Sequence, residues 1–265
     1  MVWDFILTGW RRSGTTLLSS LLDSHPSIVC DNDSFNFFFS GDRYFEFLSR
    51  GGLGPARREN GFLYGLKTLD PFLVPSFKHP AIEKSIRRSG LETAIPAFDD
   101  YSDLVAQFTQ ALVGSSPKVI NVVRHALFVY VSEQIALQRR EFRYSSPFSE
   151  RFALVFDMDH FRRWFAVKRS IESRVAFLKQ PARTIHVFYE DLTSAKRRDA
   201  ILRRIWRFLG VENLPVWSGL PKQLPTDLHD CVINYDEMLA QLRASELAFL
   251  AEQTPSLDVE VERGQ

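Results

Sequence analysis

The sequence predicts an α/β fold with three layers, in which a central, mostly parallel sheet carries helices on both faces. Short apolar runs alternate along the chain with segments of helical apolar spacing. The length of 265 residues suits one large α/β domain and is marginal for two. Hydrophobic residues make up 45% of the chain, enough for a sizeable core. We therefore expect a single domain over residues 1–265.

Five short apolar runs have the length and composition of buried strands. The expected strands are 2–8, 27–30, 62–66, 118–123 and 184–188. The run KVINVV at 118–123 is the strongest candidate for a central strand, because it is apolar at nearly every position. Strands of this kind, separated by helices, pair in parallel.

Apolar residues at helical spacing predict the elements between these strands. The expected helices are 15–24, 42–50, 101–113, 126–140, 159–179, 197–209 and 235–252. The first has four leucines on one face and ends at His25-Pro26, because the residue before a proline is pushed out of the helical region. Gly210 stands where a helix-ending glycine belongs. Residues 141–157 and 213–230 lack a regular pattern and are expected to form loops.

Charge and cysteine usage exclude several classes of protein. There are 33 basic and 32 acidic residues, so generic nucleic-acid binding has no support. Cys30 and Cys231 match neither a metal site nor a disulfide scaffold, which favours a reducing compartment. No run reaches the roughly 18 apolar residues of a membrane span, and the first strand leaves no room for a signal peptide. We expect a cytoplasmic protein. The sequence does not indicate an oligomeric state.

A glycine-rich turn between the first strand and the first helix carries the strongest chemical signal. Residues 9–16 read GWRRSGTT, and Gly9 and Gly14 have the spacing of a phosphate-binding P-loop. Such a loop turns backbone N–H groups inward, and the helix N-terminus adds partial positive charge. Thr15 occupies the position of the lysine that holds the β- and γ-phosphates in nucleoside-triphosphate enzymes. The loop, with Arg12 as its cation, therefore suits a single phosphate better than ATP or GTP.

Arg12-Ser13-Gly14-Thr15-Thr16, with the leucines and His25-Pro26 behind it, resembles the 5′-phosphosulfate loop of the sulfotransferase family. Members with R-S-G-T-T are bacterial, carbohydrate and protein-tyrosine sulfotransferases. The resemblance implies a P-loop-like fold and 3′-phosphoadenosine 5′-phosphosulfate (PAPS) as donor, leaving 3′,5′-adenosine bisphosphate (PAP). It assigns the 5′-phosphate to residues 12–16, including Ser13 and Thr16.

Two further segments resemble the rest of the family's donor site. Arg124 follows the 118–123 strand, and Ser132 lies eight residues later, the spacing with which the family holds the 3′-phosphate. The family often has Arg-Asp-Pro at the first position, whereas this chain has Arg-His-Ala. Tyr189 belongs to a Y-E-D-L segment whose tyrosine lies near the adenine in the family. Glu190 and Asp191 beside it are expected in caps and ion pairs.

The catalytic residues implied by the resemblance are Arg12, Lys67 and Asp33. Arg12 stabilises the leaving phosphate, and Lys67, which matches a family K-T segment, acts from the other side. Asp33 stands near the position of the glutamate base of protein-tyrosine sulfotransferases, with Asp31 and Asp70 as alternatives. No metal is expected.

The acceptor is expected to be a hydroxyl or amine of a glycan or small metabolite. Residues 35–60 and 141–165, which are aromatic and basic, are candidates for its site. Two alternatives stay open. One is a P-loop-like nucleotide kinase or NTPase, which the threonine at position 15 and the arginine after KVINVV disfavour. The other is a non-catalytic protein that binds adenosine bisphosphate.

Overall fold

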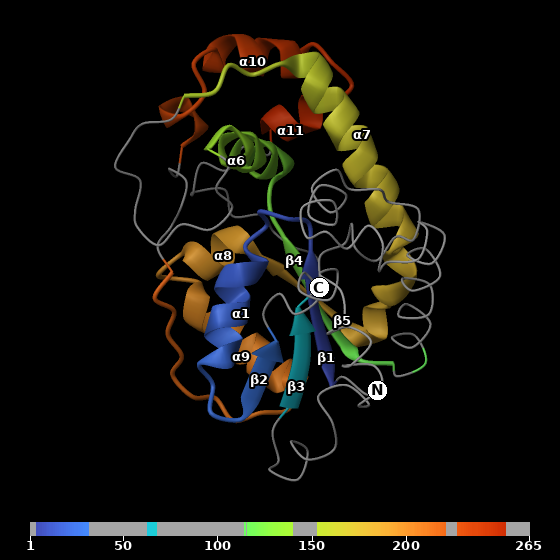
Figure 1. Cartoon of the computed structure of the whole chain (residues 1–265), viewed down its shortest axis with the longest axis vertical. Coiled ribbons are helices and arrows are strands. Elements are labelled where there is room, and N and C mark those ends of the chain that lie inside the picture. Colours follow the sequence, from blue (N-terminus) through green and yellow to red (C-terminus); the bar gives the residue numbers. More distant parts are fainter. Residues whose placement is uncertain are drawn as a thin grey trace, which may run out of the picture. The chain divides into compact units, whose positions relative to one another are not determined.

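A computed structural model describes residues 4–31, 63–67, 114, 116–139, 153–220 and 227–252 of the chain (Figure 1). The predicted helices at 42–50 and 101–113 lie outside these residues. The chain divides into two compact units. Unit 1 comprises Met1–Val123 with Lys168–Leu220, and unit 2 comprises Arg124–Val167 with Pro221–Gln265. That the whole chain is one domain stays a prediction.

Unit 1 contains a five-stranded sheet that is parallel throughout. Its order is β2-β3-β1-β4-β5, so the first strand lies at the centre. The strands are β1 (Phe5–Gly9), β2 (Ile28–Asp31), β3 (Leu63–Lys67), β4 (Lys118–Val123) and β5 (Thr184–Phe188). The predicted α/β fold with a parallel sheet is confirmed, and each strand lies within one or a few residues of its predicted position.

Helices of unit 1 cover one face of this sheet. They are α1 (Thr15–Asp23), α8 (Tyr189–Thr193) and α9 (Arg198–Leu209). Leucines of α1 and the apolar side of α9 pack with alternate residues of the strands into one core, with Trp206 buried at its centre. Gly210 ends α9 in the left-handed conformation, as predicted, and its N–H donates to the carbonyl of Trp206.

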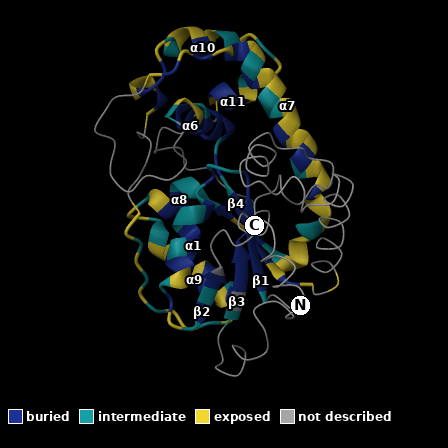
Figure 2. Ribbon diagram, viewed as in Figure 1, coloured by how far each residue is buried: buried dark blue, intermediate teal, exposed yellow. Residues whose placement is uncertain are grey.

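The central strand β1 and most of its neighbour β4 are buried on both faces (Figure 2), whereas His186 of the edge strand β5 is exposed. Phe5 and Leu7 point into the core with α1 and α9, whereas Ile6 between them points the other way and is also buried. Gly65 of β3 pairs with Phe5, and the phenyl ring lies so close that a Cβ on Gly65 would come within 1.9 Å of it. A side chain at position 65 therefore cannot coexist with this ring position.

Unit 2 is helical in its described part. Its elements are α6 (Ala126–Arg139), the first part of α7 (Met158–Arg174), a 3₁₀ turn (Leu228–Asp230), α10 (Tyr235–Arg243) and α11 (Ala248–Glu252). The predicted helix over 159–179 is shorter than expected, because α7 ends at Arg174 and short 3₁₀ turns follow at Ala176–Leu178 and Pro181–Arg183. Aromatic rings fill the core of this unit around Tyr130 and Phe161.

The prediction of one continuous helix over 235–252 is wrong, because the chain forms α10 and α11 with a break between them. Ser245 lies in the break. Its hydroxyl donates to the carbonyl of Leu242 at 2.8 Å and accepts the N–H of Leu247 at 3.1 Å. A serine side chain that satisfies backbone groups locally competes with helical hydrogen bonds, and here it ends one helix and starts the next.

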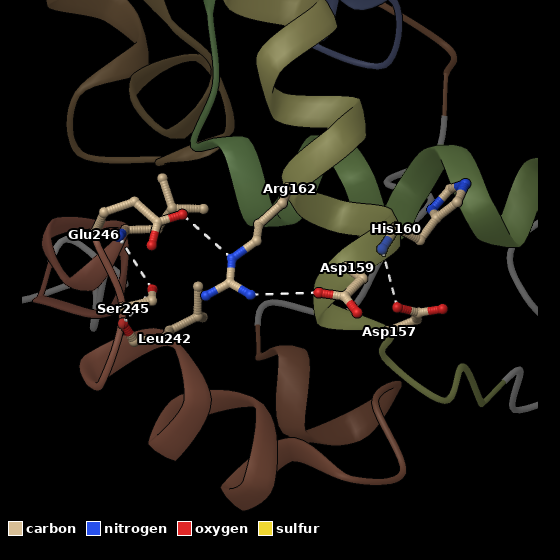
Figure 3. A network of polar contacts seen from close by, with 8 residues as sticks. Asp157, Asp159, His160, Arg162, Leu242, Ser245 and Glu246 are labelled. Atoms are coloured by element: carbon tan, nitrogen blue, oxygen red, sulfur yellow. Dashed lines mark hydrogen bonds and ion pairs between the residues drawn. The ribbon is translucent and has the colours of Figure 1, made fainter.

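Arg162 of α7 ties this break to its own helix (Figure 3). Its Nε donates to Glu246 Oε1 at 3.2 Å, and its Nη1 donates to Asp159 Oδ1 at 3.3 Å. Both carboxylates and the guanidinium are substantially exposed, so these ion pairs contribute little to stability. Cys30 and Cys231 are both buried, and neither forms a disulfide among the described residues. Among the helices described, none is long and apolar enough to cross a membrane.

Candidate functional site

The carboxyl ends of β1 and β4 mark the point where the chain's connections diverge. β1 and β4 are neighbours, but the chain leaves β1 toward β2 on one side and leaves β4 toward β5 on the other. In open parallel sheets, ligands bind outside the carboxyl ends of the strands at such a switch point. The glycine-rich loop at 10–14 lies at this edge, directly after β1.

The loop is a tight turn with two residues in the left-handed region. The N–H of Ser13 donates to the carbonyl of Trp10 at 3.1 Å, which closes the turn. Arg12 has φ of 65° and Gly14 has φ of 99°. Left-handed residues alternating with ordinary ones direct successive N–H groups to one side, the geometry of an anion-binding nest. Gly9 is needed because a Cβ there would lie 2.5 Å from the carbonyl oxygen of Val122.

The N-terminus of α1 adds to the positive potential of this loop. The N–H groups of its first turn have no acceptors within the helix, and the turn contains no acidic residue. The hydroxyl of Ser13 is buried, with the residue 1% exposed, and finds no hydrogen-bond partner among the described residues. Thr15, the first residue of α1, is buried, and Thr16 is the next residue of the same turn. The donors gathered here suit an anion of one phosphate's size.

Lys67, the last residue of β3, brings a cation to the first turn of α1. Its Nζ donates to Thr16 Oγ1 at 2.9 Å, and the residue is only 3% exposed. Burial lowers the pKa of Lys67 to about 8, although the nearby Cys30 opposes part of that shift. The lysine that is missing from position 15 of the loop is thus replaced, at the same helix turn, by one from a neighbouring strand.

Tyr189, the first residue of α8, also lies against the loop. A Cβ on Gly14 would come within 2.3 Å of Cδ2 of its ring, so the ring and the glycine backbone are in close contact. Of the residues predicted for this site, the structure therefore brings Gly14, Thr16, Lys67 and Tyr189 to the carboxyl edge of the sheet. Asp191 pairs with Arg197 at 3.2 Å, which confirms its expected place in an ion pair.

Two residues of the loop's surroundings escaped the prediction. The ring of Trp10 is buried, and the Nζ of Lys168 lies 5.9 Å from its centroid. Lys168 is 8% exposed and is also hydrogen-bonded to Glu172, one turn further along α7. The backbone carbonyl of Trp10 accepts the hydrogen bond that closes the loop, so Lys168 lies beside the residue on which the turn closes. The only local signal was the tryptophan inside the glycine-rich turn.

Arg124 and Ser132 belong to unit 2. Arg124 lies just before α6, and Ser132 lies on it. The guanidinium carbon of Arg124 lies 5.7 Å from the ring centroid of Phe128. Ser132 follows Phe128 by four residues, so both lie on one side of the helix. Arg124 is 9% exposed and Ser132 2% exposed. The two predicted residues are thus on the same side of α6, and a cation and a hydroxyl there have the chemistry of a phosphate site.

The predicted bases are not settled by this geometry. Asp33 and Asp70 lie outside the described residues. Asp31 ends β2, at the same carboxyl edge of the sheet as Lys67, but only its backbone is described.

No family model matches this sequence, and no curated protein matches it. Solved structures similar in fold are a sulfotransferase from Alicyclobacillus acidocaldarius, a mouse sulfotransferase complexed with PAP, and the sulfotransferase domain of the Synechococcus PCC 7002 olefin synthase. Their TM-scores are 0.45, 0.39 and 0.38, with 14%, 14% and 19% sequence identity. The matches cover 95%, 94% and 98% of this chain, in the same order. They cover 96%, 88% and 89% of the three solved chains. Each of the three is named a sulfotransferase.

Proposed function

We propose that this protein is a sulfotransferase that uses PAPS as donor and a hydroxyl or amine of a glycan or small metabolite as acceptor. The observation that carries the proposal is the pairing of Lys67 Nζ with Thr16 Oγ1 at 2.9 Å, beside a nest that lacks its own lysine. The nest would hold one phosphate through its backbone N–H groups, and the buried ammonium would supply positive charge beside it. ATP and GTP would instead require the loop lysine that Thr15 replaces.

In this proposal, the predicted donor residues would meet both of the phosphate-bearing groups of PAPS. The nest at 12–16 would hold the 5′-phosphate through backbone N–H groups and the guanidinium of Arg12. Arg124 and Ser132 would hold the 3′-phosphate, and Tyr189 would flank the adenine. The 3′-phosphate is a dianion and would need a cation of its own, which Arg124 would supply. When bound, PAPS would supply an activated sulfuryl group.

The chain's own residues would then divide the work of transfer. Arg12 and Lys67 would stabilise the negative charge that develops on the leaving phosphate, from opposite sides. The hydroxyl of Thr16 would keep the ammonium of Lys67 aimed at the first turn of α1. Asp33 would accept the proton of the acceptor, with Asp31 and Asp70 as alternatives. These cations would do the work that Mg²⁺ does in kinases.

A calorimetric titration with PAP, AMP and ATP tests the donor assignment. The wild-type chain should bind PAP more tightly than AMP, because AMP lacks the 3′-phosphate, and more tightly than ATP. Loss of a hydrogen bond to a charged group costs about 1.5–3 kcal/mol, so Arg124→Ala should weaken PAP binding roughly tenfold or more. The same substitution should leave AMP binding unchanged, whereas Arg12→Ala should weaken both ligands.

Arg243→Ala, which removes an exposed cation from α10, is the matched control and should change neither affinity. Tighter binding of ATP than of PAP would reject the proposal in favour of a nucleotide kinase or NTPase. PAP binding without release of PAP from PAPS over a broad panel of glycan and phenolic acceptors would instead favour a non-catalytic binding protein.

A further inference from the structure

The outward side of α9 carries three exposed arginines in its second and third turns. The inward side packs into the core of unit 1 through Ile201, Leu202, Ile205, Trp206 and Leu209. The exposed positions include Arg203, Arg204 and Arg207, with Lys196 exposed in the turn before the helix. We call these four residues the basic stripe. Asp199 is the one carboxylate in the α9 sequence.

Asp199 is exposed between Lys196 and Arg203 on the same helix surface, so it offsets part of the charge of the basic stripe. Within the described part of the chain, none of its four side chains makes an ion pair or a hydrogen bond. Arg197, which lies between Lys196 and the helix, is different, because its guanidinium pairs with Asp191. Charges of both signs are otherwise balanced in this protein, with 33 basic and 32 acidic residues. The stripe is therefore a local excess of positive charge on a nearly neutral chain.

Like charges within the stripe repel one another. Arg203 and Arg207 are four residues apart and Arg204 and Arg207 three, so both pairs are neighbours on the helix surface and repel each other. The positive region continues toward the edge strand β5: partial burial lowers the pKa of His186, and the charges of Lys179 and Arg204 lower it further. A bound anion would relieve this repulsion, which gives the surface a reason to bind one.

The composition of the stripe selects among anionic partners. The helix α9 that carries it has no exposed large apolar side chain, so this surface lacks the aromatic and aliphatic centre of a protein–protein interface and the apolar face that enters a membrane. It also lacks aromatic rings for stacking the bases of single-stranded nucleic acid. Three of its four cations are arginines, whose planar guanidinium pairs with sulfate or carboxylate through two parallel hydrogen bonds.

The stripe also has a direction. α9 follows β5 and α8, so its N-terminal end starts near the carboxyl edge of the sheet, where the phosphate loop lies. Its C-terminal end lies at the amino edge, because Lys118, the first residue of β4, donates from Nζ to the carbonyl of Leu209 at 3.0 Å. The stripe spans eleven residue steps, or roughly 16 Å at the helical rise. That length matches a few sugar units of an extended chain.

We propose that the basic stripe binds a linear anionic polysaccharide, whose sulfate or carboxylate groups pair with Lys196, Arg203, Arg204 and Arg207. Binding to the stripe does not depend on the proposed transferase activity. The additional statement that the bound polymer is the acceptor or the product rests on that activity.

The test uses the full-length chain and a heparin dodecasaccharide as probe, with binding followed by fluorescence anisotropy between 50 and 300 mM NaCl. Arg203→Gln/Arg207→Gln removes two cations of the stripe. Arg163→Gln/Arg243→Gln removes two exposed cations of α7 and α10 and is the matched control for net charge. Thermal unfolding and PAP titration of each variant report whether the fold and the donor site are intact.

The stripe variant should bind the dodecasaccharide about tenfold more weakly, and the slope of log K against log salt should fall by between one and two, because about 0.7–0.9 of a counterion is released per contact in comparable polyanions. The control variant should bind like the wild type, and PAP binding should be equal in all three. Equal losses in both variants would show that only net charge matters. Tighter binding of a single-stranded oligonucleotide of equal charge would assign the surface to nucleic acid. Either outcome overturns the proposal.

Discussion

The ammonium of Lys67 lies 2.9 Å from the hydroxyl of Thr16, although the two residues come from different elements and are 51 positions apart in the chain. This hydrogen bond joins the end of β3 to the first turn of α1. It gives the phosphate loop a cation that its own sequence lacks, and it leaves that cation almost completely buried. The stability of the protein should therefore depend on the charge of a single lysine.

The free energy of unfolding should rise with pH between 8 and 10.5 because of Lys67. Burial lowers its pKa from 10.5 to about 8, so in this range the unfolded chain binds a proton that the folded chain does not. The contribution is fully present above pH 10.5 and is lost as the pH falls through 8. Its full size is about 3 kcal/mol, from 1.36 kcal/mol per pKa unit. Urea unfolding at pH 7 and pH 10 measures it.

Lys67→Met keeps the aliphatic stem and removes the titration. The wild type should therefore gain more stability than the variant between pH 7 and pH 10, and the two curves should run parallel below pH 7. An identical pH dependence in both proteins would contradict the burial of this ammonium. In a PAPS turnover assay, the variant should lose a factor of about 10² in kcat, the loss typical for removal of one stabilising donor.

Gly65→Ala should destabilise the protein by about 3 kcal/mol, because a Cβ there would overlap the ring of Phe5 and overpacking of a core costs about 1–3 kcal/mol or more. Chemical denaturation of Gly65→Ala, Phe5→Leu and the double variant checks this. The double variant should be more stable than the sum of the two single losses predicts, since leucine frees the space that the new methyl group needs. Strict additivity would show that the two residues do not compete for the same volume.

Lys168→Met should destabilise the protein by about 1–3 kcal/mol, because it leaves Glu172 without its partner and Trp10 without the cation above its ring. Adding Glu172→Leu should recover part of this loss, since removal of both members of a largely buried pair leaves no unpaired charge. Thermal unfolding of the three variants provides the comparison. A double variant less stable than Lys168→Met would refute this account of the pair.

His25→Ala should cost about 2–3 kcal/mol, because the ring is 1% exposed and both of its nitrogens are hydrogen-bonded. Nδ1 accepts the N–H of Ser27 at 3.1 Å, so Nε2 carries the proton and donates to the carbonyl of Glu212 at 3.0 Å. The substitution removes both hydrogen bonds and opens a cavity beside Trp206. His229→Ala, at an exposed histidine, should have little effect in the same unfolding experiment.

Local patterns predicted the elements that depend on local chemistry. The strand 118–123, the loop glycines and the helix-ending Gly210 follow from apolar runs and from backbone conformations that only some residues adopt easily. The break between α10 and α11 was missed because a serine inside a helical pattern does not reveal whether its hydroxyl will bond to the helix's own backbone. Nothing in the pattern indicates that it will here.

Contacts between distant segments were beyond sequence patterns for a different reason. Lys168 and Trp10 are 158 positions apart, and their contact depends on how α7 lies in unit 1. Gly65 looks like an ordinary strand glycine until Phe5 is placed beside it. The sequence predicted a cation at Lys67 only through a family resemblance, and the hydrogen bond to Thr16 depends on the pairing of β3 with β1.

The left-handed backbone of Arg12 sets the folding stability of this protein against its chemistry. An L-residue other than glycine at φ of 65° carries a conformational cost of about 1–2 kcal/mol. Arg12→Gly would remove that cost and the guanidinium together. A laboratory selection for heat resistance alone would therefore enrich glycine at position 12. The resulting protein would be more stable, but its phosphate loop would lack the guanidinium. A selection that demands turnover would hold the arginine in place and would have to find its stabilising changes elsewhere in the chain.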